Sequence, residues 1–395
     1  MAAHNSLANI RVVLGMLVVV TVTLLTSATA YYQNFNFPSL FRPPPDYSGD
    51  PAYLRNIPSK ADELRDFFIR DVADSAIAVD ATIYQPNGAW HWDNPSGGDK
   101  WPEKLGKKLC ILDIDSRPLD NPGQIFGNTT LSWSNPDIIS GTSLGILQHW
   151  LYAKIHNYTY YWVHTDEFED GRRGSWKKPS ILRRVLQKHP TCVYVDSDAI
   201  FHHLDLPLEW LLNYWSIDKQ KDLVALAKDP DLKHNYDQKG RLYDNTGFII
   251  AQSNTTTFNM MDDWATCADD GGKFPNCTEW RVKKPNHPSD QGGFGNYIRY
   301  EYEDSIRELP CAEANGFLEH KTECVGTFVQ HLWTGKNDLL KIAVGKHIPG
   351  MFLELFHEKM MVEKSEFYIT EKELMSQKWL HAPINSTKAV EGRSS

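Results

Sequence analysis

The 395-residue chain lacks several features that would place it in a common class. It has no long basic stretch, and its formal net charge is -9, so a nucleic-acid partner is not expected. Its six cysteines include no Cys-x-x-Cys pair and no His/Cys cluster, so no zinc site is predicted. No internal repeat is visible. With 41% hydrophobic and 23% charged residues, the composition is that of a globular chain long enough to bury a core.

One long apolar run stands at the N-terminus. Residues 12–30 carry no charge and follow Arg11. An α-helix of about 20 apolar residues crosses a bilayer, and a basic residue before it favours a cytosolic N-terminus. A cleaved signal peptide is the alternative, because the Ala-Thr-Ala sequence at 28–30 resembles a cleavage site. We expect residues 1–30 to be a transmembrane signal anchor or a signal peptide, and either would export the rest of the chain.

Two further patterns agree with export. The sequence has five acceptor sequons for N-linked glycans, at Asn128, Asn157, Asn254, Asn276 and Asn385. Four cysteines form locally spaced pairs that would close short loops in an oxidising compartment, namely Cys267 with Cys277 and Cys311 with Cys324. The other two, Cys110 and Cys192, stand in apolar runs, and we expect them to be buried free thiols.

The exported part divides into a linker-like segment and a larger body. Residues 31–50 are polar and include three consecutive prolines, which indicates an extended stem. Residues 52–79 have a more helical pattern, and a loop rich in Gly, Pro and Trp follows as far as residue 100. We therefore expect residues 31–100 to be a stem and N-terminal extension, and residues 101–395 to be the catalytic domain.

Apolar runs and helical patterns alternate along this body. Short apolar runs at 108–115, 158–163 and 191–195 predict strands, and the apolar spacing at 141–155 and 179–188 predicts helices. Such alternation predicts an α/β fold with a mainly parallel central sheet and helices on both faces. Ligands of such sheets bind at the carboxyl ends of the strands, which is where this sequence places acidic residues.

The strongest chemical signal directly follows the predicted strand at 191–195. Asp196 and Asp198 are separated by Ser197, and in an extended chain this spacing puts both carboxylates on one face. Carboxylates are preferred ligands of hard divalent cations, and a departing nucleotide diphosphate needs such a cation to neutralise its charge. The same pattern also occurs in solvated loops, so it depends on support from the rest of the chain.

Four other motifs supply that support: Trp176-Lys177-Lys178-Pro179, Asn245-Thr246-Gly247, Asp290-Gln291, and His331 with Lys336 five residues later. With these motifs in this order, residues 108–342 resemble glycosyltransferase family 34. That family includes fungal α-galactosyl- and α-mannosyltransferases and plant xyloglucan xylosyltransferases. The resemblance implies a GT-A fold (a Rossmann-like fold for nucleotide-diphospho-sugar transferases), a retaining reaction, and dependence on a divalent metal, usually Mn²⁺.

The resemblance also implies roles for residues at matching positions. The metal ligands would be Asp196, Asp198 and His331. Asp290 and Gln291 match a pair beside the reacting sugar and are the predicted catalytic residues. The residues predicted to bind the nucleotide sugar are Lys178, Asp196, Ser197, Asp198, Asn245 and Lys336. The residues alone leave other roles open for two of these positions. Asp290 could cap a helix at 295–300, and Asn245 could supply the turn before a strand.

We therefore expect a glycosyltransferase that moves a hexose from a UDP-galactose or GDP-mannose type of donor to a glycan acceptor. It would be a single-pass type II protein of the Golgi membrane with its catalytic body in the lumen. The sequence also leaves open that the protein forms complexes with other glycosyltransferases. Segments 267–288 and 301–324 look like insertions relative to the family, and they leave the identity of donor and acceptor open.

Two other interpretations remain. The sequence at 111–118 resembles the opening motif of haloacid-dehalogenase-like phosphatases, with Asp113 as the nucleophile. The later acidic pair that such an enzyme needs, Asp262-Asp263, lies in a helical pattern. The second alternative is an exported carbohydrate-binding glycoprotein without activity. The presence of both Asp196 and Asp198, together with His331 and Lys336, argues against this loss of activity.

Overall fold

The computed structural model describes residues 59–86, 88, 90–281, 288–316 and 322–384. The predicted anchor or signal peptide and the predicted stem at 31–50 lie outside these described residues. No helix within the described ranges is long and apolar enough to cross a membrane. The described residues belong to one compact unit that begins at Ser59.

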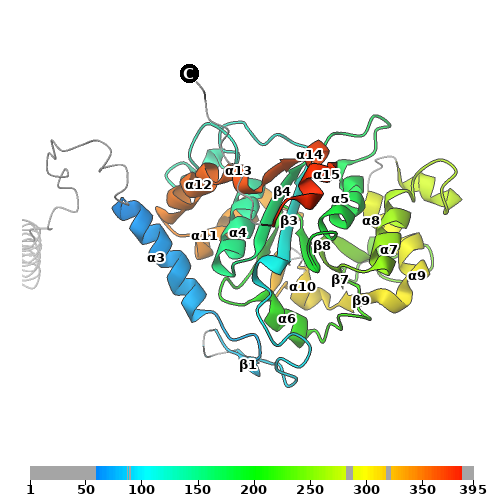
Figure 1. Cartoon of the computed structure of the whole chain (residues 1–395), viewed down its shortest axis with the longest axis horizontal. Coiled ribbons are helices and arrows are strands. Elements are labelled where there is room, and N and C mark those ends of the chain that lie inside the picture. The colour runs from blue at the N-terminus through cyan, green and yellow to red at the C-terminus, as the bar shows by residue number, and fades with distance from the viewer. Residues whose placement is uncertain (1–58, 87, 89, 282–287, 317–321, 385–395) are drawn as a thin grey trace, which may run out of the picture. The chain divides into compact units, whose positions relative to one another are not determined.

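A seven-stranded sheet forms the centre of this unit, in the order β11-β4-β3-β5-β8-β7-β9 (Figure 1). Of these strands, β8 runs antiparallel to both of its neighbours, and all the other pairings are parallel. The predicted α/β fold with a mainly parallel sheet is therefore confirmed. In sheet order the strands are Tyr368–Thr370, Thr159–His164, Leu109–Asp115, Thr191–Val195, Asp244–Gln252, Val224–Lys228 and Ile306–Leu309.

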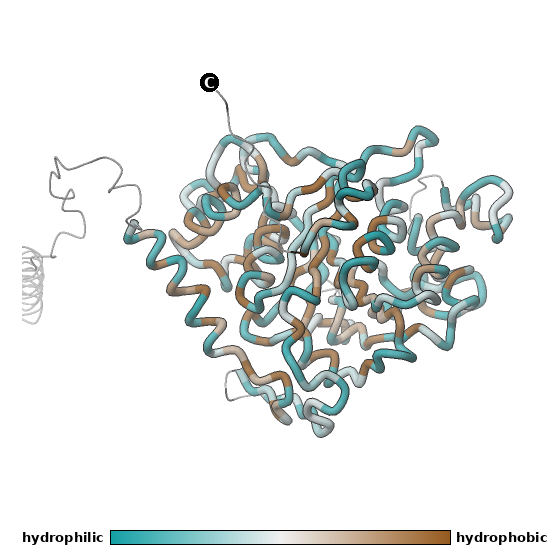
Figure 2. The backbone as a smooth tube through the Cα atoms, in the orientation of Figure 1, coloured by the Kyte–Doolittle hydropathy of each residue, from teal (hydrophilic) through white to brown (hydrophobic). Residues whose placement is uncertain are grey.

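Helices cover both faces of the sheet. Successive strand residues alternate between the two layers, so that in β3 Ile111 faces the first layer and Leu112 faces the second. Because both faces are buried, the central strands are apolar along their length, and Figure 2 shows hydrophobic residues along the strands and the inner sides of the helices. The first layer contains α4 (Gly141–Ile155), α11 (Lys336–His347) and α12 (Phe352–Val362), and the second contains α5 (Lys178–Val185), α7 (Thr255–Ala265) and the π-helical η6 (Phe294–Ile298).

The described part of the predicted N-terminal extension packs on this body. Helix α3 (Lys60–Ser75) begins with a capping box at Ser59, and its Phe68 lies against Phe352 and Phe356 of α12, with ring centroids 4.9 and 5.2 Å apart. The hairpin of β1 (Ile83–Tyr84) and β2 (Trp92–Asp93) follows α3 in sequence. The predicted boundary between extension and catalytic domain, at residues 100 and 101, falls inside the same compact unit.

All six cysteines are paired in disulfides. The prediction that Cys110 and Cys192 are free thiols is wrong, because they form a disulfide with Cα atoms 4.5 Å apart. They stand opposite each other in the parallel strands β3 and β5. This register, between two runs 82 residues apart, cannot be derived from either run alone. The two locally spaced pairs form as predicted, Cys267 with Cys277 and Cys311 with Cys324.

The ends of several strands meet at one edge of the sheet. Strands β3, β5 and β7 end there, and β8 begins there because it runs in the opposite direction. A two-stranded antiparallel sheet of β6 (Ala199–Phe201) and β10 (Val329–His331) pairs His331 with Ala199. The late histidine is thus brought next to Asp198, although the two are 133 positions apart.

Candidate active site

A cavity of about 260 Å³ opens where β5 and β7 end and β8 begins. Several elements contribute to its lining, including the turn after β5, the start of β8, helix α8 (Ser289–Gly293) and the end of β10. The separate sequence motifs therefore converge on one hollow. The predicted site residues that line it are Asp196, Asp198, Asn245, Gln291 and His331.

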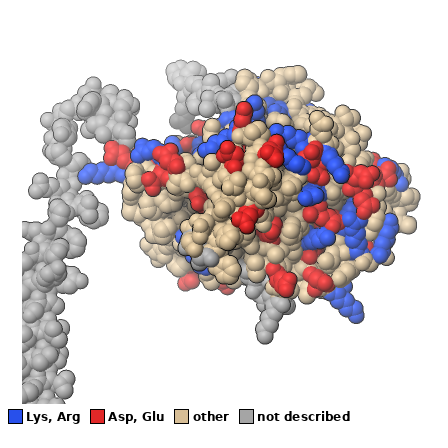
Figure 3. Space-filling model, turned by 90° about the horizontal axis from the view of Figure 1, so that it is seen from below, with Lys and Arg blue, Asp and Glu red and all other residues tan. Residues whose placement is uncertain are grey.

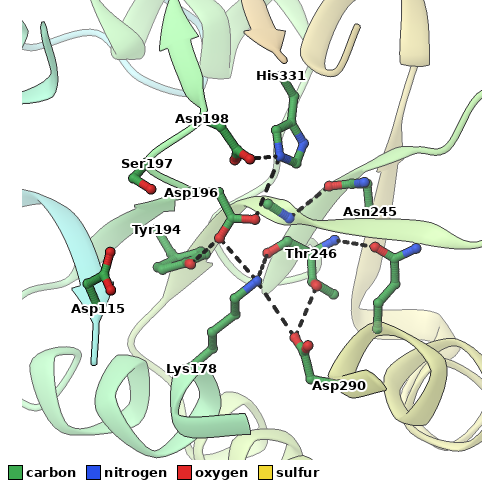
Figure 4. Close-up of polar contacts among 12 residues, drawn as sticks. Asp115, Lys178, Tyr194, Asp196, Ser197, Asp198, Asn245, Thr246, Asp290 and His331 are labelled. Carbon is green, nitrogen blue, oxygen red and sulfur yellow. Dashed lines mark hydrogen bonds and ion pairs between the residues drawn. The ribbon is translucent and has the colours of Figure 1, made fainter. Parts of the chain in front are cut away.

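Asp196, Asp198 and His331 form a compact set of ligand atoms (Figure 4). Each residue offers one such atom, and the three atoms lie within 4.8 Å of one another. The Nε2 atom of His331 is 3.2 Å from Asp198 Oδ1 and 3.6 Å from Asp196 Oδ2. Two carboxylates and one imidazole are donors that suit Mn²⁺ and related divalent cations, so the residues present fit the metal that the resemblance implies.

Backbone contacts fix the turn that carries the two aspartates. The N–H of Asp196 donates to the carbonyl of Gly247 in β8 at 2.7 Å, and the N–H of Leu332 donates to the carbonyl of Asp198 at 2.8 Å. Helix α4 approaches the same turn at Gly145, where an added β-carbon would lie 2.2 Å from the carbonyl oxygen of Ser197. The strand, the small sheet and the helix therefore hold both carboxylates in place together.

The charge state of Asp198 is set by its neighbours. Burial raises its pKa, but the hydrogen bond with His331 and the positive charges of His331 and Lys336 outweigh burial and hold the pKa below its usual range. The Nζ atom of Lys336, the first residue of α11, donates to Asp198 Oδ2 at 2.9 Å. The Lys336 side chain is 49% exposed, so it is also accessible to an anion from solvent.

Lys178, by contrast, is a buried side chain that contacts one of the predicted metal ligands. It is the first residue of α5 and only 6% exposed. Its Nζ atom donates to the carbonyl of Thr246 at 3.0 Å and lies 3.2 Å from Asp196 Oδ1 and 3.7 Å from Asp290 Oδ2 (Figure 4). Burial lowers the pKa of the ammonium, but the two carboxylates outweigh it and raise the pKa. Lys178 thus links Asp196 to Asp290, and its contact with a nucleotide sugar stays a prediction.

Asp290 and Gln291 lie in the first turn of α8. The alternative role of Asp290 as a helix cap is wrong, because the helix begins at Ser289 and its N-cap, Pro288, makes no side-chain cap bond. The carboxylate of Asp290 instead accepts a hydrogen bond from Thr246 Oγ1 at 3.1 Å. Gln291 lines the cavity, whereas Asp290 is buried behind it.

The last two predicted residues differ in where they point. Asn245 lies inside β8, so the alternative that it supplies a turn before the strand is wrong. Its side chain lines the cavity. Ser197 Oγ instead lies 3.5 Å from Arg117 Nη2, and Arg117 in turn donates to both carboxylate oxygens of Asp115 at the end of β3. Ser197 therefore contacts the loop after β3 and is not part of the cavity lining.

The cavity also has lining residues that the sequence analysis does not predict. Asp229 follows the apolar strand β7, which is the same signal that marks Asp196, but that strand is not among the predicted ones. The others come from the short 3-10 helix η4 (Lys233–Asn235) with the residue before it, and from the loop after His331. They are Leu232, His234, Asn235 and Trp333.

The acids of the phosphatase interpretation lie elsewhere. Asp113 is 2% exposed, accepts a hydrogen bond from Tyr160 at 2.7 Å, and lies 3.0 Å from His149 Nδ1. Asp262 and Asp263 lie on α7, where they pair with Arg183 and Lys273 respectively. Neither Asp113 nor the α7 pair lines the cavity. On the face of the protein shown in Figure 3, basic and acidic side chains lie interspersed.

The chain is similar in fold to several solved structures, at low sequence identity. A glycosyltransferase involved in the glycosylation of the major capsid of PBCV-1 has 12% identity and a TM-score of 0.41, over 60% of this chain and 98% of that one. Mouse xyloside xylosyltransferase 1 has 8% identity and a TM-score of 0.34, over 56% and 96%. The galactosyltransferase LgtC, solved with donor and acceptor sugar analogs, has 10% identity and a TM-score of 0.33, over 60% of this chain and 95% of that one. Similarity at this level does not assign any site residue.

The sequence comparison is more informative. No curated protein matches the chain. Residues 146–269 match the model of the galactosyl transferase GMA12/MNN10 family. This segment runs from α4 through the Asp-Ser-Asp motif and β8 to the end of α7, and it stops before Asp290, Gln291, His331 and Lys336. The match confirms the resemblance to glycosyltransferase family 34 over these residues, and it identifies the chain as a glycosyltransferase.

Proposed function

We propose that this enzyme transfers a hexosyl group from a nucleotide sugar to a glycan acceptor, with a divalent cation, Mn²⁺, as cofactor. The observation that carries the proposal is the convergence of Asp196, Asp198 and His331 within 4.8 Å at the edge of a cavity, with Lys336 bonded to Asp198. A cation held by this set would offset the negative charge of a departing diphosphate.

The chain's own residues supply the other parts of the reaction. Lys336 places a positive charge beside Asp198, where the diphosphate gains negative charge as the bond to the anomeric carbon breaks. Asn245 and Gln291 offer amide groups to the sugar in the cavity, and Asp290 stands behind them as a carboxylate held by Thr246 and Lys178. In a retaining transfer the acceptor oxygen bonds to the anomeric carbon on the leaving-group face, and its proton departs with the diphosphate.

The predicted metal ligands Asp196, Asp198 and His331 line the same cavity as Asn245 and Gln291. This supports a donor whose sugar contacts the two amides while its diphosphate reaches the metal ligands. The donors we propose to test first are UDP-galactose and GDP-mannose, which carry one hexose each.

We propose further that the protein is a single-pass type II protein of the Golgi membrane with this unit in the lumen. Three disulfides support an oxidising compartment. The four described sequon residues, Asn128, Asn157, Asn254 and Asn276, are all exposed. Protease protection of the unit in intact vesicles, and a mass decrease on treatment with a glycan-removing enzyme, would support this orientation. Digestion from the cytosolic side would contradict it.

The function is tested with the purified full-length chain. Nucleotide release and glycan product are measured with each donor, with Mn²⁺ or with a chelator. We expect metal-dependent use of one donor, and loss of that activity in Asp198→Ala with an unchanged circular dichroism spectrum. Asp263→Ala, which removes an acid on α7 outside the cavity, is the matched control. Full turnover in chelator, or in Asp198→Ala, would refute the metal assignment.

A further inference from the structure

Asp229 is a buried carboxylate with an unusual set of partners. It follows β7, is 5% exposed, and lines the cavity. Its Oδ1 atom accepts a hydrogen bond from Asn245 Nδ2 at 2.8 Å, and its Oδ2 atom accepts one from Gln291 Nε2 at 2.7 Å. Among the ion pairs of the described residues, none joins Asp229 to a lysine or arginine. Burial raises its pKa, and the hydrogen bonds from the two amides, the nearby His331 and the amide of Asn315 oppose that rise.

The backbone determines which way round the two amides stand. The Oδ1 atom of Asn245 accepts from the N–H of Gly247 at 2.8 Å, and the Oε1 atom of Gln291 accepts from the N–H of Thr246 at 3.2 Å. A backbone N–H can only donate, so the oxygen end of each amide must face β8. The nitrogen end of each amide must then face an acceptor, and Asp229 supplies one oxygen to each.

We propose that Asp229 is a positioning residue that fixes the amides of Asn245 and Gln291 for contact with the transferred sugar. Each amide keeps a second N–H and a second oxygen lone pair for a ligand, and both side chains line the cavity. With their orientation fixed, the two amides present a defined pattern of donors and acceptors to sugar hydroxyls. This inference rests on the proposed function, because the ligand that reads the pattern is the sugar of the donor.

The substitution Asp229→Asn tests this inference with a side chain of the same shape. The new amide offers one oxygen and one NH₂ group to two NH₂ groups, so one contact becomes donor against donor. Either Asn245 or Gln291 must then turn, and its NH₂ group would meet a backbone N–H of β8. The oxygens of the predicted metal ligands are not bonded to Asp229, so a nucleoside diphosphate alone should still bind.

The measurements compare UDP with UDP-galactose, and GDP with GDP-mannose, all in Mn²⁺ and with the full-length chain. For Asp229→Asn we expect unchanged affinity for the nucleoside diphosphate and a fall in kcat for transfer of about 10- to 100-fold, the size of the loss found when residues that orient metal ligands are changed. The control is Asp222→Asn, which alters a buried aspartate that accepts from the N–H of Asp218 and lies outside the cavity. It should behave as the wild type.

A second variant separates orientation from a general loss of folding. In Asp229→Asn with Asn245→Asp, the carboxylate at 245 accepts from both the N–H of Gly247 and the new amide at 229. That amide's oxygen then accepts from Gln291. We expect the melting temperature to fall in Asp229→Asn and to recover in the double variant. A double variant no more stable than the sum of the single changes would overturn the inference.

The outcomes distinguish this inference from the function on which it rests. If the wild type binds neither UDP nor GDP in Mn²⁺, the proposed function fails and the inference with it. If the wild type transfers a sugar and Asp229→Asn transfers it equally fast, only the role of Asp229 is overturned. Equal losses of nucleoside diphosphate binding and of kcat would also overturn it, because they would indicate general damage to the site.

Discussion

His331 packs directly on the backbone of Gly247. A β-carbon added at position 247 would stand 2.1 Å from His331 Cε1 and 2.8 Å from its Nε2 atom, closer than real contacts allow. The same glycine accepts a hydrogen bond from the N–H of Asp196 and donates its own N–H to Asn245. One residue of β8 thus leaves space for one predicted metal ligand and holds the backbone of another.

Gly247→Ala should therefore weaken metal binding without unfolding the chain. The methyl group would push the imidazole of His331 away from Asp198, and displaced support of this kind typically costs about 10- to 100-fold in metal affinity. Titration of Mn²⁺ by its electron paramagnetic resonance signal measures the change. Gly345→Ala is the control, since its β-carbon would meet Trp133 at an ordinary 3.6 Å within α11. Equal Mn²⁺ affinity in Gly247→Ala and wild type would contradict the proposed role of His331.

Lys336→Ala should weaken the binding of a nucleoside diphosphate far more than it affects the fold. Its ammonium lies 2.9 Å from Asp198 Oδ2 and is half exposed. A charged hydrogen bond lost at such a site costs about 1.5–3 kcal/mol, or roughly 10- to 100-fold in Kd. Calorimetric titration with UDP or GDP in Mn²⁺ measures it. Lys346→Ala, at the exposed far end of the same helix, should bind as the wild type does. Equal losses in the two variants would indicate only a general effect of charge.

The fold was the easiest part to predict from the sequence. Strands β3, β4 and β5 are covered on both faces, so each appears as a continuous apolar run. Helix α4 lies at its predicted bounds, and α5 begins one residue before the predicted range 179–188 and ends three residues before the end of that range. Acids at the ends of β3 and β5 follow from the same pattern. What periodicity cannot give is the register between distant strands, and the disulfide of Cys110 with Cys192 depends on that register alone.

The site was predicted in part, and mostly from the family resemblance. Nothing in the local pattern around His331 places it beside Asp198, since that contact depends on the pairing of β10 with β6. Asp229 and the antiparallel direction of β8 were not predicted. The signal for Asp229 was present, as an apolar run ending in an acid. Its role could not be seen there, because it lies in hydrogen bonds to Asn245 and Gln291 from two other segments.

The disulfide between β3 and β5 should stabilise the fold without contributing to the reaction. Cys110 and Cys192 lie in the second core layer, away from the cavity. Their bond closes a long loop, with a sequence separation of 82, and removing a native disulfide typically costs about 2–5 kcal/mol. Replacing both by alanine should lower the free energy of unfolding, measured by urea titration, by a similar amount and leave kcat unchanged at low temperature. Reaction of the unreduced, denatured wild type with a thiol reagent should find no free cysteine. Two free thiols per chain would refute the pairing.

Buried histidines should make the fold sensitive to mild acid, and His156 is a clear case. It follows α4, its Nε2 atom bonds to the carbonyl of Leu204 at 2.8 Å, and burial lowers its pKa from 6.5 to about 4. The unfolded chain takes up this proton near pH 6.5 and the folded chain only near pH 4. The stability that His156 contributes is therefore complete above pH 6.5 and lost as pH falls toward 4, by about 1.4 kcal/mol per pH unit. Burial raises the pKa of Asp244 to about 7, so the contribution of Asp244 to stability changes with pH in the opposite direction.

Urea unfolding at pH 7, 6 and 5 should show a shallower loss of stability in His156→Gln than in the wild type or in a variant of the exposed His91. Parallel curves for His156→Gln and the wild type would show that His156 is not the group that titrates.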